Sequence, residues 1–254
     1  MNVTCPICLC KAGNYKRKID KYFIYKCAEC GLEYTDAIPT DDDLYLFYNS
    51  YKDIRADTTI VQINAKNNRD KLLAYGLTKD SKILDFGCGN GEFVEICGMN
   101  CYGVELGGHI HKRIYNTIEK LPIKKFEFIT LWGVLEHINN IKDIMKNVSK
   151  YLKKGGYIMI TTVDAEGKIP YYYKPPEHLT YWTKRSLNIL ANYLECDVKE
   201  ISEYNMEQYS HIYIDRLLSR TPQNYARIIK KSIKDLPKIV NVPTNEFFAV
   251  LKKR

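Results

Sequence analysis

Apolar runs of strand length alternate with longer amphipathic stretches over most of the chain. The runs fall near residues 82–85, 101–105, 125–131 and 156–163. Between the last two, residues 140–153 repeat apolar side chains at helical spacing and end before a pair of glycines. Strands and helices that alternate in this way form a parallel sheet with helices on both faces. The pattern therefore predicts an α/β fold.

The residues before this region are expected to hold two helices and one strand. Thr40 and the acids after it form a helix start, because a threonine caps the first turn and carboxylates stabilise it. A second helix is expected over residues 59–75, with Gly76 ending it. The apolar run Tyr22–Lys26 predicts a strand near the N-terminus.

Further elements are expected after the parallel strands. A helix begins at Thr183, and Val198–Ile201 and Phe247–Leu251 form a closing antiparallel pair. Residues 204–243 are long for a hairpin connection. We therefore expect one or two helices there, including residues 223–234.

Four of the nine cysteines have the spacing of a metal site. They form two CxxC pairs separated by 18 residues, made by Cys5, Cys8, Cys27 and Cys30. Four thiolates at this spacing can close a tetrahedral zinc site, and a segment this small needs the metal to fold. We expect a zinc ribbon at residues 1–38, a helical linker or cap at 39–76 and the α/β domain at 77–254.

A glycine turn follows the first strand of the α/β region. Asp85 precedes Gly87, Gly89 and Gly91, and Glu105 ends the next apolar run, 20 residues after Asp85. Glycines allow a sharp turn and close approach of a ligand, and a carboxylate at that distance can hold a ribose. The third glycine comes one residue early for GxGxxG, and the aspartate before the turn would repel a pyrophosphate. The motif suits S-adenosylmethionine (SAM), which carries an ammonium and a sulfonium.

The positive charge of the chain is concentrated near its C-terminus. The net charge is +8, and residues 216–254 hold ten Lys/Arg against two Asp/Glu, which accounts for the whole excess (10 − 2 = 8). This segment is either a patch for a phosphate-bearing substrate or nucleic acid, or an ordinary solvated helix face. The longest apolar runs, such as Phe128–Leu131, are too short to span a bilayer. No secretion signal is evident at the start, so we expect a cytoplasmic protein without a membrane span.

Several segments together resemble a known enzyme family. They are the glycine turn, Tyr48–Tyr51, Thr117–Glu119, Ile129–His137 and Leu152–Gly156, preceded by the cysteine ribbon. The chain looks like the class I SAM-dependent methyltransferases with an N-terminal zinc ribbon that accompany sugar and surface-polysaccharide biosynthesis. These are related to the deoxysugar C-methyltransferases, whose long C-terminal domain this chain lacks. The resemblance implies a seven-stranded Rossmann-like fold. It also implies that the chain is similar to the shorter members of the family, which mostly methylate oxygen.

The resemblance also assigns roles to residues. The Glu136–His137 pair follows the fourth strand, where the histidine of the related C-methyltransferases is the proposed base; here it either removes a proton or only shapes the pocket. His178, in the loop after the fifth strand, is the second candidate. Substrate contacts are expected from Tyr48, Tyr51, Tyr172 and Tyr181. Cofactor contacts are expected from Asp85, Gly87, Cys88, Gly89, Gly91, Phe93, Glu105, Leu106, Ile118, Leu131 and Trp132.

The predicted function is SAM-dependent O-methylation of a sugar, a nucleotide-sugar or a sugar substituent, including a phosphate-like group. The partner is then a small sugar-linked acceptor. One alternative is an RNA methyltransferase, favoured by the basic C-terminus but not by Leu131–Val134, which lacks the Asn/Asp-Pro-Pro-aromatic motif common in base N-methylation. The other is a non-catalytic SAM-binding protein, against which the intact glycine turn and Glu105 argue. The acceptor and the oligomeric state are not specified by the sequence.

Overall fold

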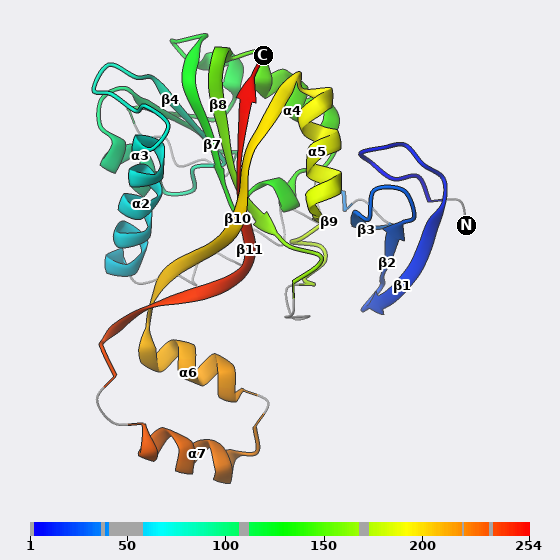
Figure 1. Ribbon diagram of the computed structural model, residues 1–254, viewed down its shortest axis with the longest axis vertical. Coiled ribbons are helices and arrows are strands. Elements are labelled where there is room, and N and C mark those ends of the chain that lie inside the picture. The colour runs from blue at the N-terminus through cyan, green and yellow to red at the C-terminus, as the bar shows by residue number, and fades with distance from the viewer. Residues whose placement is uncertain are drawn as a thin grey trace.

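A seven-stranded mixed sheet forms the centre of the molecule (Figure 1). The computed structural model describes residues 3–36, 39–40, 58–106, 112–167, 173–219, 221–233 and 236–254. The strand order across the sheet is β10-β11-β8-β7-β4-β5-β6. Strand β11 runs in the direction opposite to that of the other six strands. The strands are β4 (Ile83–Phe86), β5 (Cys101–Val104), β6 (Ile114–Tyr115), β7 (Phe126–Trp132), β8 (Leu152–Val163), β10 (Cys196–Tyr209) and β11 (Ile239–Lys253). The predicted α/β fold with a Rossmann-like sheet is confirmed.

Helices cover both faces of this sheet, as the alternation predicted. The α-helices are α2 (Thr58–Leu73), α3 (Glu92–Cys97), α4 (Ile141–Ser149), α5 (Lys184–Tyr193), α6 (Ser210–Leu218) and α7 (Gln223–Ser232). Successive strand residues belong to different core clusters, with Leu84 packed beside α4 and α5 and Ile83 beside α2 and α3. Each strand therefore contributes to two apolar cores, one on each face.

The predicted helix over residues 140–153 is wrong at its C-terminal end. Helix α4 ends at Ser149, and Leu152 already begins β8, where it pairs with Phe126. The pairing register then shifts before Phe128 meets Tyr157, and Gly155 takes a φ of 75° within the shifted segment. The glycines thus form a bulge in a strand rather than a helix stop. Glycine is typical of both features, so the sequence pattern alone fits either one.

The closing antiparallel pair is much longer than predicted. Strands β10 and β11 pair from Cys196↔Lys253 to Tyr209↔Ile239, and β11 leaves β8 after Glu246↔Val163. Beyond that point the two strands continue as a separate ribbon that carries α6 and α7 away from the sheet (Figure 1). The helices expected between the closing strands are therefore present.

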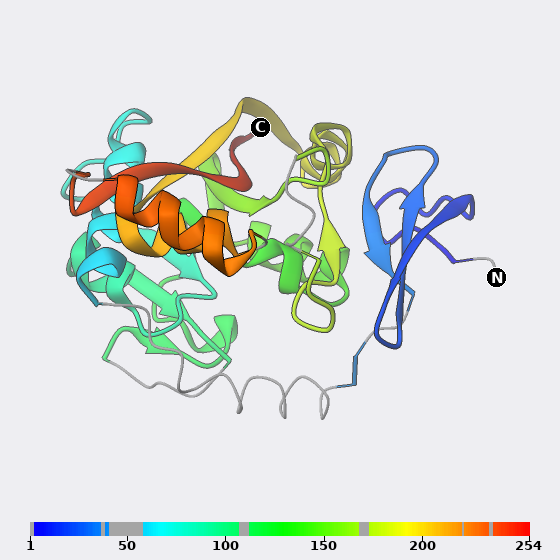
Figure 2. The same ribbon diagram turned by 90° about the horizontal axis from the view of Figure 1, so that it is seen from below.

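The N-terminal residues form a second, four-stranded sheet that includes a strand from the α/β region. Its order is β1-β2-β3-β9, made of β1 (Gly13–Ile19), β2 (Tyr22–Cys27), β3 (Glu33–Thr35) and β9 (Thr180–Tyr181). Figure 2 shows the N-terminal strands beside the main sheet rather than within it. The helix predicted after Thr40 falls in residues 41–57, outside the described residues. The predicted domain limits stay predictions.

Two buried polar contacts hold the N-terminal sheet to the α/β region. The Thr183 hydroxyl donates to the Cys30 carbonyl oxygen at 2.8 Å, and it also caps α5 by accepting from the Ser186 N–H at 3.1 Å. Glu33 is fully buried and its carboxylate accepts from the Tyr173 hydroxyl and the Lys16 ammonium. The segment after β8 is thereby attached to the N-terminal sheet on both sides of β9.

None of the described helices is long and apolar enough to cross a bilayer.

Replacing Thr183 with valine tests the first of these contacts. The change keeps the side-chain shape but removes the cap of α5 and the bond to Cys30, so the free energy of unfolding should fall by about 1–2 kcal/mol. Urea denaturation followed by circular dichroism measures this change. Thr221→Val, in the α6–α7 connection, is the matched control and should leave the midpoint unchanged; equal midpoints for both variants would contradict the assigned role of Thr183.

Candidate functional site

The glycine turn lies at the carboxyl end of β4, where the strand order reverses between β7 and β5. Open α/β sheets bind ligands at this switch point. Gly87 and Gly89 have φ values of 76° and 52°, and Gly91 begins α3 with a φ of 87°. A Cβ added at Gly89 would meet nothing within 4 Å, so Gly89 presents bare backbone to an open space, whereas Cβ atoms at Gly87 and Gly91 would collide with the Val134 and Ile114 side chains.

Two carboxylates face this turn. Asp85 is buried and accepts from the Thr130 hydroxyl at 2.7 Å, whereas Glu105 accepts from the Gly89 N–H at 2.9 Å. The pKa of Asp85 is raised to about 7, mainly by burial, against the opposing hydrogen bond from Thr130 and with a smaller contribution from the nearby Glu105 carboxylate. Acidic groups beside an open glycine turn suit a ligand with cationic groups and a ribose. The residues present therefore fit SAM, with Asp85, the glycines and Glu105 positioned to hold it.

Aromatic rings adjoin the turn from β7, β11 and α3. The Trp132 ring lies parallel to Phe248 at 6.2 Å between centroids and edge-on to Phe93 at 5.5 Å. Its indole nitrogen is buried, and no described residue accepts a hydrogen bond from it. An orphaned buried donor beside the glycine turn is a further feature that fits a bound ligand.

The remaining predicted cofactor contacts differ in exposure. Leu106 is exposed, and Cys88 and Ile118 are buried. Leu131 has no exposed surface and packs into the core beside α4 and α5, and its contact with the cofactor stays a prediction.

Glu136, His137 and His178 form a compact cluster at the same edge of the sheet. Glu136 and His137 belong to the short helix η3 (Leu135–His137), which follows β7. The His137 and His178 rings are edge-to-face at 4.9 Å between centroids, and Nε2 of His137 lies 3.9 Å from Oε1 of Glu136. Besides the four ribbon cysteines, this is the only group of three or more His, Cys, Asp or Glu side chains in the described part of the chain whose ligand atoms could together reach one metal ion.

Hydrogen bonds orient this cluster. Nδ1 of His137 lies 2.7 Å from the Glu177 carbonyl oxygen, an acceptor, so in the neutral ring this nitrogen carries the proton. Glu136 is buried and accepts from the Thr162 hydroxyl at 2.7 Å. The Leu179 N–H donates to the Glu136 carbonyl oxygen at 2.8 Å. The loop after β8 and the end of β7 are thus fixed to each other.

Burial changes the pKa of both groups in the pair. It raises the pKa of Glu136 to about 7, although hydrogen bonds to its carboxylate oppose this. It lowers the pKa of His137, an effect that the Glu177 carboxylate partly counteracts. His137 is therefore a neutral base at physiological pH, with its side chain 22% exposed.

Sequence reasoning missed Glu246. It lies on β11 where that strand leaves β8, and its pKa is raised to about 8, mainly by burial and in smaller part by the Glu136 carboxylate. The only signal in the sequence is an acid directly before the apolar run Phe247–Leu251.

The predicted substrate residues divide into described and undescribed ones. Tyr48, Tyr51 and Tyr172 lie outside the described residues. Tyr181 is buried in β9, where its hydroxyl donates to the His178 carbonyl oxygen at 3.1 Å and accepts from the Lys174 N–H at 3.2 Å. This placement makes Tyr181 a support for the loop that carries His178.

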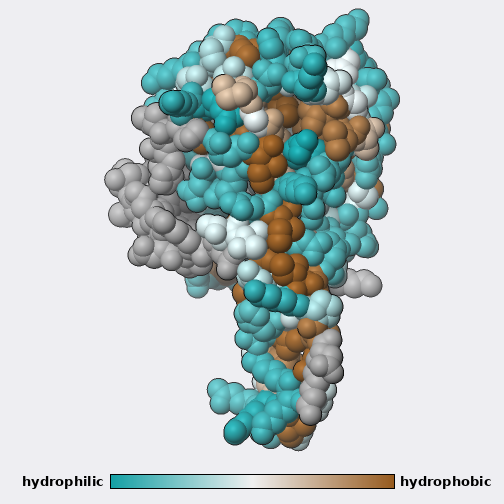
Figure 3. Space-filling model, turned by 90° about the vertical axis from the view of Figure 1, so that its left-hand side faces the viewer, coloured by the Kyte–Doolittle hydropathy of each residue, from teal (hydrophilic) through white to brown (hydrophobic). Residues whose placement is uncertain are grey.

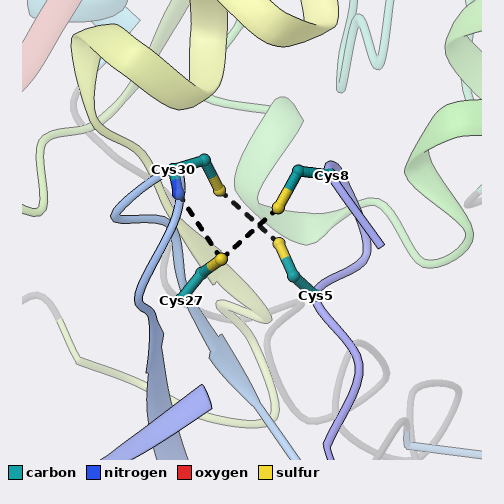
Figure 4. Close-up of side chains that lie close together, drawn as sticks. All are labelled: Cys5, Cys8, Cys27 and Cys30. Atoms are coloured by element: carbon teal, nitrogen blue, oxygen red, sulfur yellow. Dashed lines mark hydrogen bonds between the residues drawn. The ribbon is translucent and has the colours of Figure 1, made fainter. Parts of the chain in front are cut away.

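The four predicted metal ligands come together at the end of the N-terminal sheet. Figure 4 shows the sulfur atoms of Cys5, Cys8, Cys27 and Cys30 pointing toward one another. The Cys5–Cys30 and Cys8–Cys27 sulfur separations are 3.6 and 3.4 Å. A tetrahedron with Zn–S bonds of 2.3 Å has S–S edges of about 3.8 Å, so the donor set fits zinc.

Comparisons with known proteins agree with this geometry. A family model described as a methyltransferase domain matches residues 61–199, more than half of the chain. No curated protein matches the chain. A SAM-dependent methyltransferase from Archaeoglobus fulgidus has a similar structure, with 20% identity, 83% of this chain and 99% of that chain covered, and a TM-score of 0.54. So does the 1,6-didemethyltoxoflavin-N1-methyltransferase of Burkholderia thailandensis, solved with 1,6-didemethyltoxoflavin and S-adenosylhomocysteine, with 13% identity, 94% and 98% covered, and a TM-score of 0.54.

The similarity in structure establishes the fold, and the family match covers the glycine turn, Glu105 and the Glu136–His137 pair. The chain therefore belongs to the methyltransferase-domain family and is a SAM-dependent methyltransferase.

Proposed function

We propose that this enzyme transfers the methyl group of SAM to a hydroxyl of a sugar, a nucleotide-sugar or a sugar substituent, in the cytoplasm. The observation that carries the proposal is the Glu136–His137–His178 cluster at the carboxyl edge of the sheet. A hydroxyl must lose its proton as it accepts a methyl group, and a neutral histidine is a suitable base.

The cofactor, when bound, supplies a methyl carbon activated by the sulfonium. Asp85 would attract its ammonium group, the bare backbone at Gly89 would lie against it, and Glu105 would bind its ribose hydroxyls. Each assignment follows from the carboxylates and the open turn at the end of β4. Holding both reactants at one edge of the sheet makes the displacement effectively unimolecular.

Proton removal is the second task of the chain. We assign it to Nε2 of His137, because Nδ1 is occupied by the Glu177 carbonyl. Glu136, next to Nε2, stabilises the imidazolium that forms, and Thr162 keeps the Glu136 carboxylate in place. His178 packs edge-on against His137 and restricts its rotation.

The part of the site around Glu136, His137 and His178 is polar, which supports a polyhydroxylated substrate. Glu136, Glu177 and Glu246 supply carboxyl oxygens there, and carboxyl oxygens accept hydrogen bonds from sugar hydroxyls. The resemblance to methyltransferases of surface-polysaccharide biosynthesis supports the same acceptor class. The Burkholderia thailandensis enzyme of the same fold was solved with a small-molecule acceptor, which is consistent with an acceptor of that size here.

We further propose that the four ribbon cysteines hold one structural Zn²⁺. Their sulfur separations support this, as does the small size of the segment that they close. Zinc would stabilise the N-terminal sheet, and through Glu33 and Thr183 it would support the loop that carries His178.

Glu105→Ala should weaken binding of SAM and S-adenosylhomocysteine by about 1.5–3 kcal/mol, the scale of a hydrogen bond to a charged group. Isothermal titration calorimetry measures this change, and NAD should not bind. Glu203→Ala, an exposed glutamate on β10, is the matched control and should bind as the wild type does. Unchanged affinity in Glu105→Ala would remove this residue from the ribose site.

Cys27→Ser should abolish zinc binding, while the wild type should contain about one Zn²⁺ per chain by elemental analysis. S-adenosylhomocysteine should still bind, because the glycine turn lies on β4, away from the N-terminal sheet. Methyl transfer should fall, because β9 and the His178 loop lose their support. Cys10→Ser is the control and should retain its zinc; zinc-free wild-type protein, or loss of zinc from Cys10→Ser, would refute the assigned ligands.

His137→Ala should leave the affinity for SAM intact and lower turnover by roughly 10²–10⁴. Burial lowers the pKa of His137, and only the neutral ring accepts a proton, so the wild-type rate should rise with pH and level off below the pKa of free imidazole. Transfer of labelled methyl groups to a panel of sugars, sugar phosphates and nucleotide-sugars measures both effects.

His211→Gln, on α6, is the control for this experiment and should keep full turnover. Near-normal turnover of His137→Ala on a neutral hydroxyl, together with loss in His178→Ala, would make His178 the base. Near-normal turnover of both variants would indicate an acceptor that is already an oxyanion and needs no base.

A further inference from the structure

The two long strands and the helices they carry form a projecting arm, which we define as residues 204–243. At its base, Asn64 of α2 bonds to the backbone of Glu207 in both directions, at 2.8 and 3.0 Å, and Asn68 accepts from the Tyr204 hydroxyl at 2.9 Å. These buried contacts fix the direction of the arm relative to the sheet. Figure 3 shows the arm standing clear of the body, with hydrophobic side chains along it.

The tip of the arm exposes apolar side chains. Neither α6 nor α7 has a buried residue. Six large apolar residues there are between 38% and 62% exposed, namely Leu217, Tyr225, Ile228, Ile229, Ile233 and Leu236. A helix of about ten residues is marginal in water without a packed apolar face. The exposed face of α7 therefore needs an occupant.

The same tip is strongly basic. Residues 210–238 contain seven Lys/Arg and two Asp, a net charge of +5 (7 − 2), out of +8 for the whole chain. Lys230 pairs with Asp215 at 2.5 Å across the two helices. Arg227, Lys230 and Lys231 lie on one face of α7 together with Gln223 and Ala226. Three cations on one helix face can meet anionic groups such as phosphates.

We propose that the arm docks on an anionic lipid surface. Short amphipathic helices that combine Lys/Arg with Ile, Leu and Tyr bind the interface of acidic membranes, because their apolar side chains enter the acyl boundary while their cations meet the headgroups. A second copy of the arm is a poorer occupant, because it would bring together two segments of charge +5 that repel each other. A nucleic acid would match the positive charge of the arm, but it would leave the exposed isoleucines and leucines in water.

The arm projects on the same side of the sheet as the candidate functional site. Strand β11 leaves the sheet at Glu246, which pairs with Val163 at the carboxyl end of β8. The arm therefore projects from the edge of the sheet that carries Glu136 and the glycine turn (Figure 1). An enzyme anchored by α7 would turn this edge toward the bilayer.

Vesicle co-sedimentation of the full chain tests the proposal. The probes are vesicles of phosphatidylcholine alone and of phosphatidylcholine with 30% phosphatidylglycerol. The wild type should bind the anionic vesicles at least about tenfold more tightly, and binding should weaken as NaCl is raised. Arg227→Gln with Lys231→Gln should reduce this partitioning about 20-fold, and Ile228→Ser with Ile229→Ser about tenfold or more.

Matched variants on the body of the protein are the controls. Lys79→Gln with Lys154→Gln removes two exposed cations, and Met99→Ser removes an exposed apolar side chain; both should partition as the wild type does. All variants should bind S-adenosylhomocysteine normally, which separates this test from the proposed methyl transfer and shows that they fold.

Three results would overturn the proposal. The first is equal partitioning of the wild type onto neutral and anionic vesicles, or none. The second is a dimer in light scattering that the Ile228→Ser, Ile229→Ser variant loses, which would make a second copy the occupant. The third is RNA binding in gel shift that depends on Arg227 and Lys231 while vesicle binding does not.

Discussion

The carboxyl edge of the parallel sheet is the constraint on which the rest of the site depends. Both faces of the sheet are covered by helices, so strand side chains within it are buried and apolar. Polar groups can gather only where the strands end. Asp85, Glu136 and Glu246 all lie there, each with a pKa raised by burial. Carboxyl groups held in this way favour partners that bring positive charge or hydrogen-bond donors, and a sulfonium cofactor brings positive charge.

Features that depend on local spacing were predictable from the sequence. The glycine turn needs positive φ values at fixed positions, and the two CxxC pairs need fixed turns, so residue type and spacing specify both. The alternation of strands and helices predicted the sheet for the same reason. The end of α4 was misplaced because Gly155 carries the same signal whether it stops a helix or forms a bulge in a strand.

Features that depend on distant segments were not predictable in this way. Glu246 approaches Glu136 only because β11 inserts beside β8, more than 80 residues along the chain. The attachment of Glu33 to Tyr173 joins two segments 140 residues apart, and nothing near either residue indicates the other. The length of β10 and β11 was also underestimated, because their outer halves pair with each other rather than with the main sheet.

The shared four-stranded sheet has a consequence for synthesis of the chain. Strand β3 ends at Thr35, but its outer partner β9 begins at Thr180, so most of the methyltransferase region is translated before the sheet can be completed. The two CxxC pairs are complete by Cys30, long before then. During translation the first three strands therefore present an open edge at β3, which closes only when the segment leading into α5 leaves the ribosome.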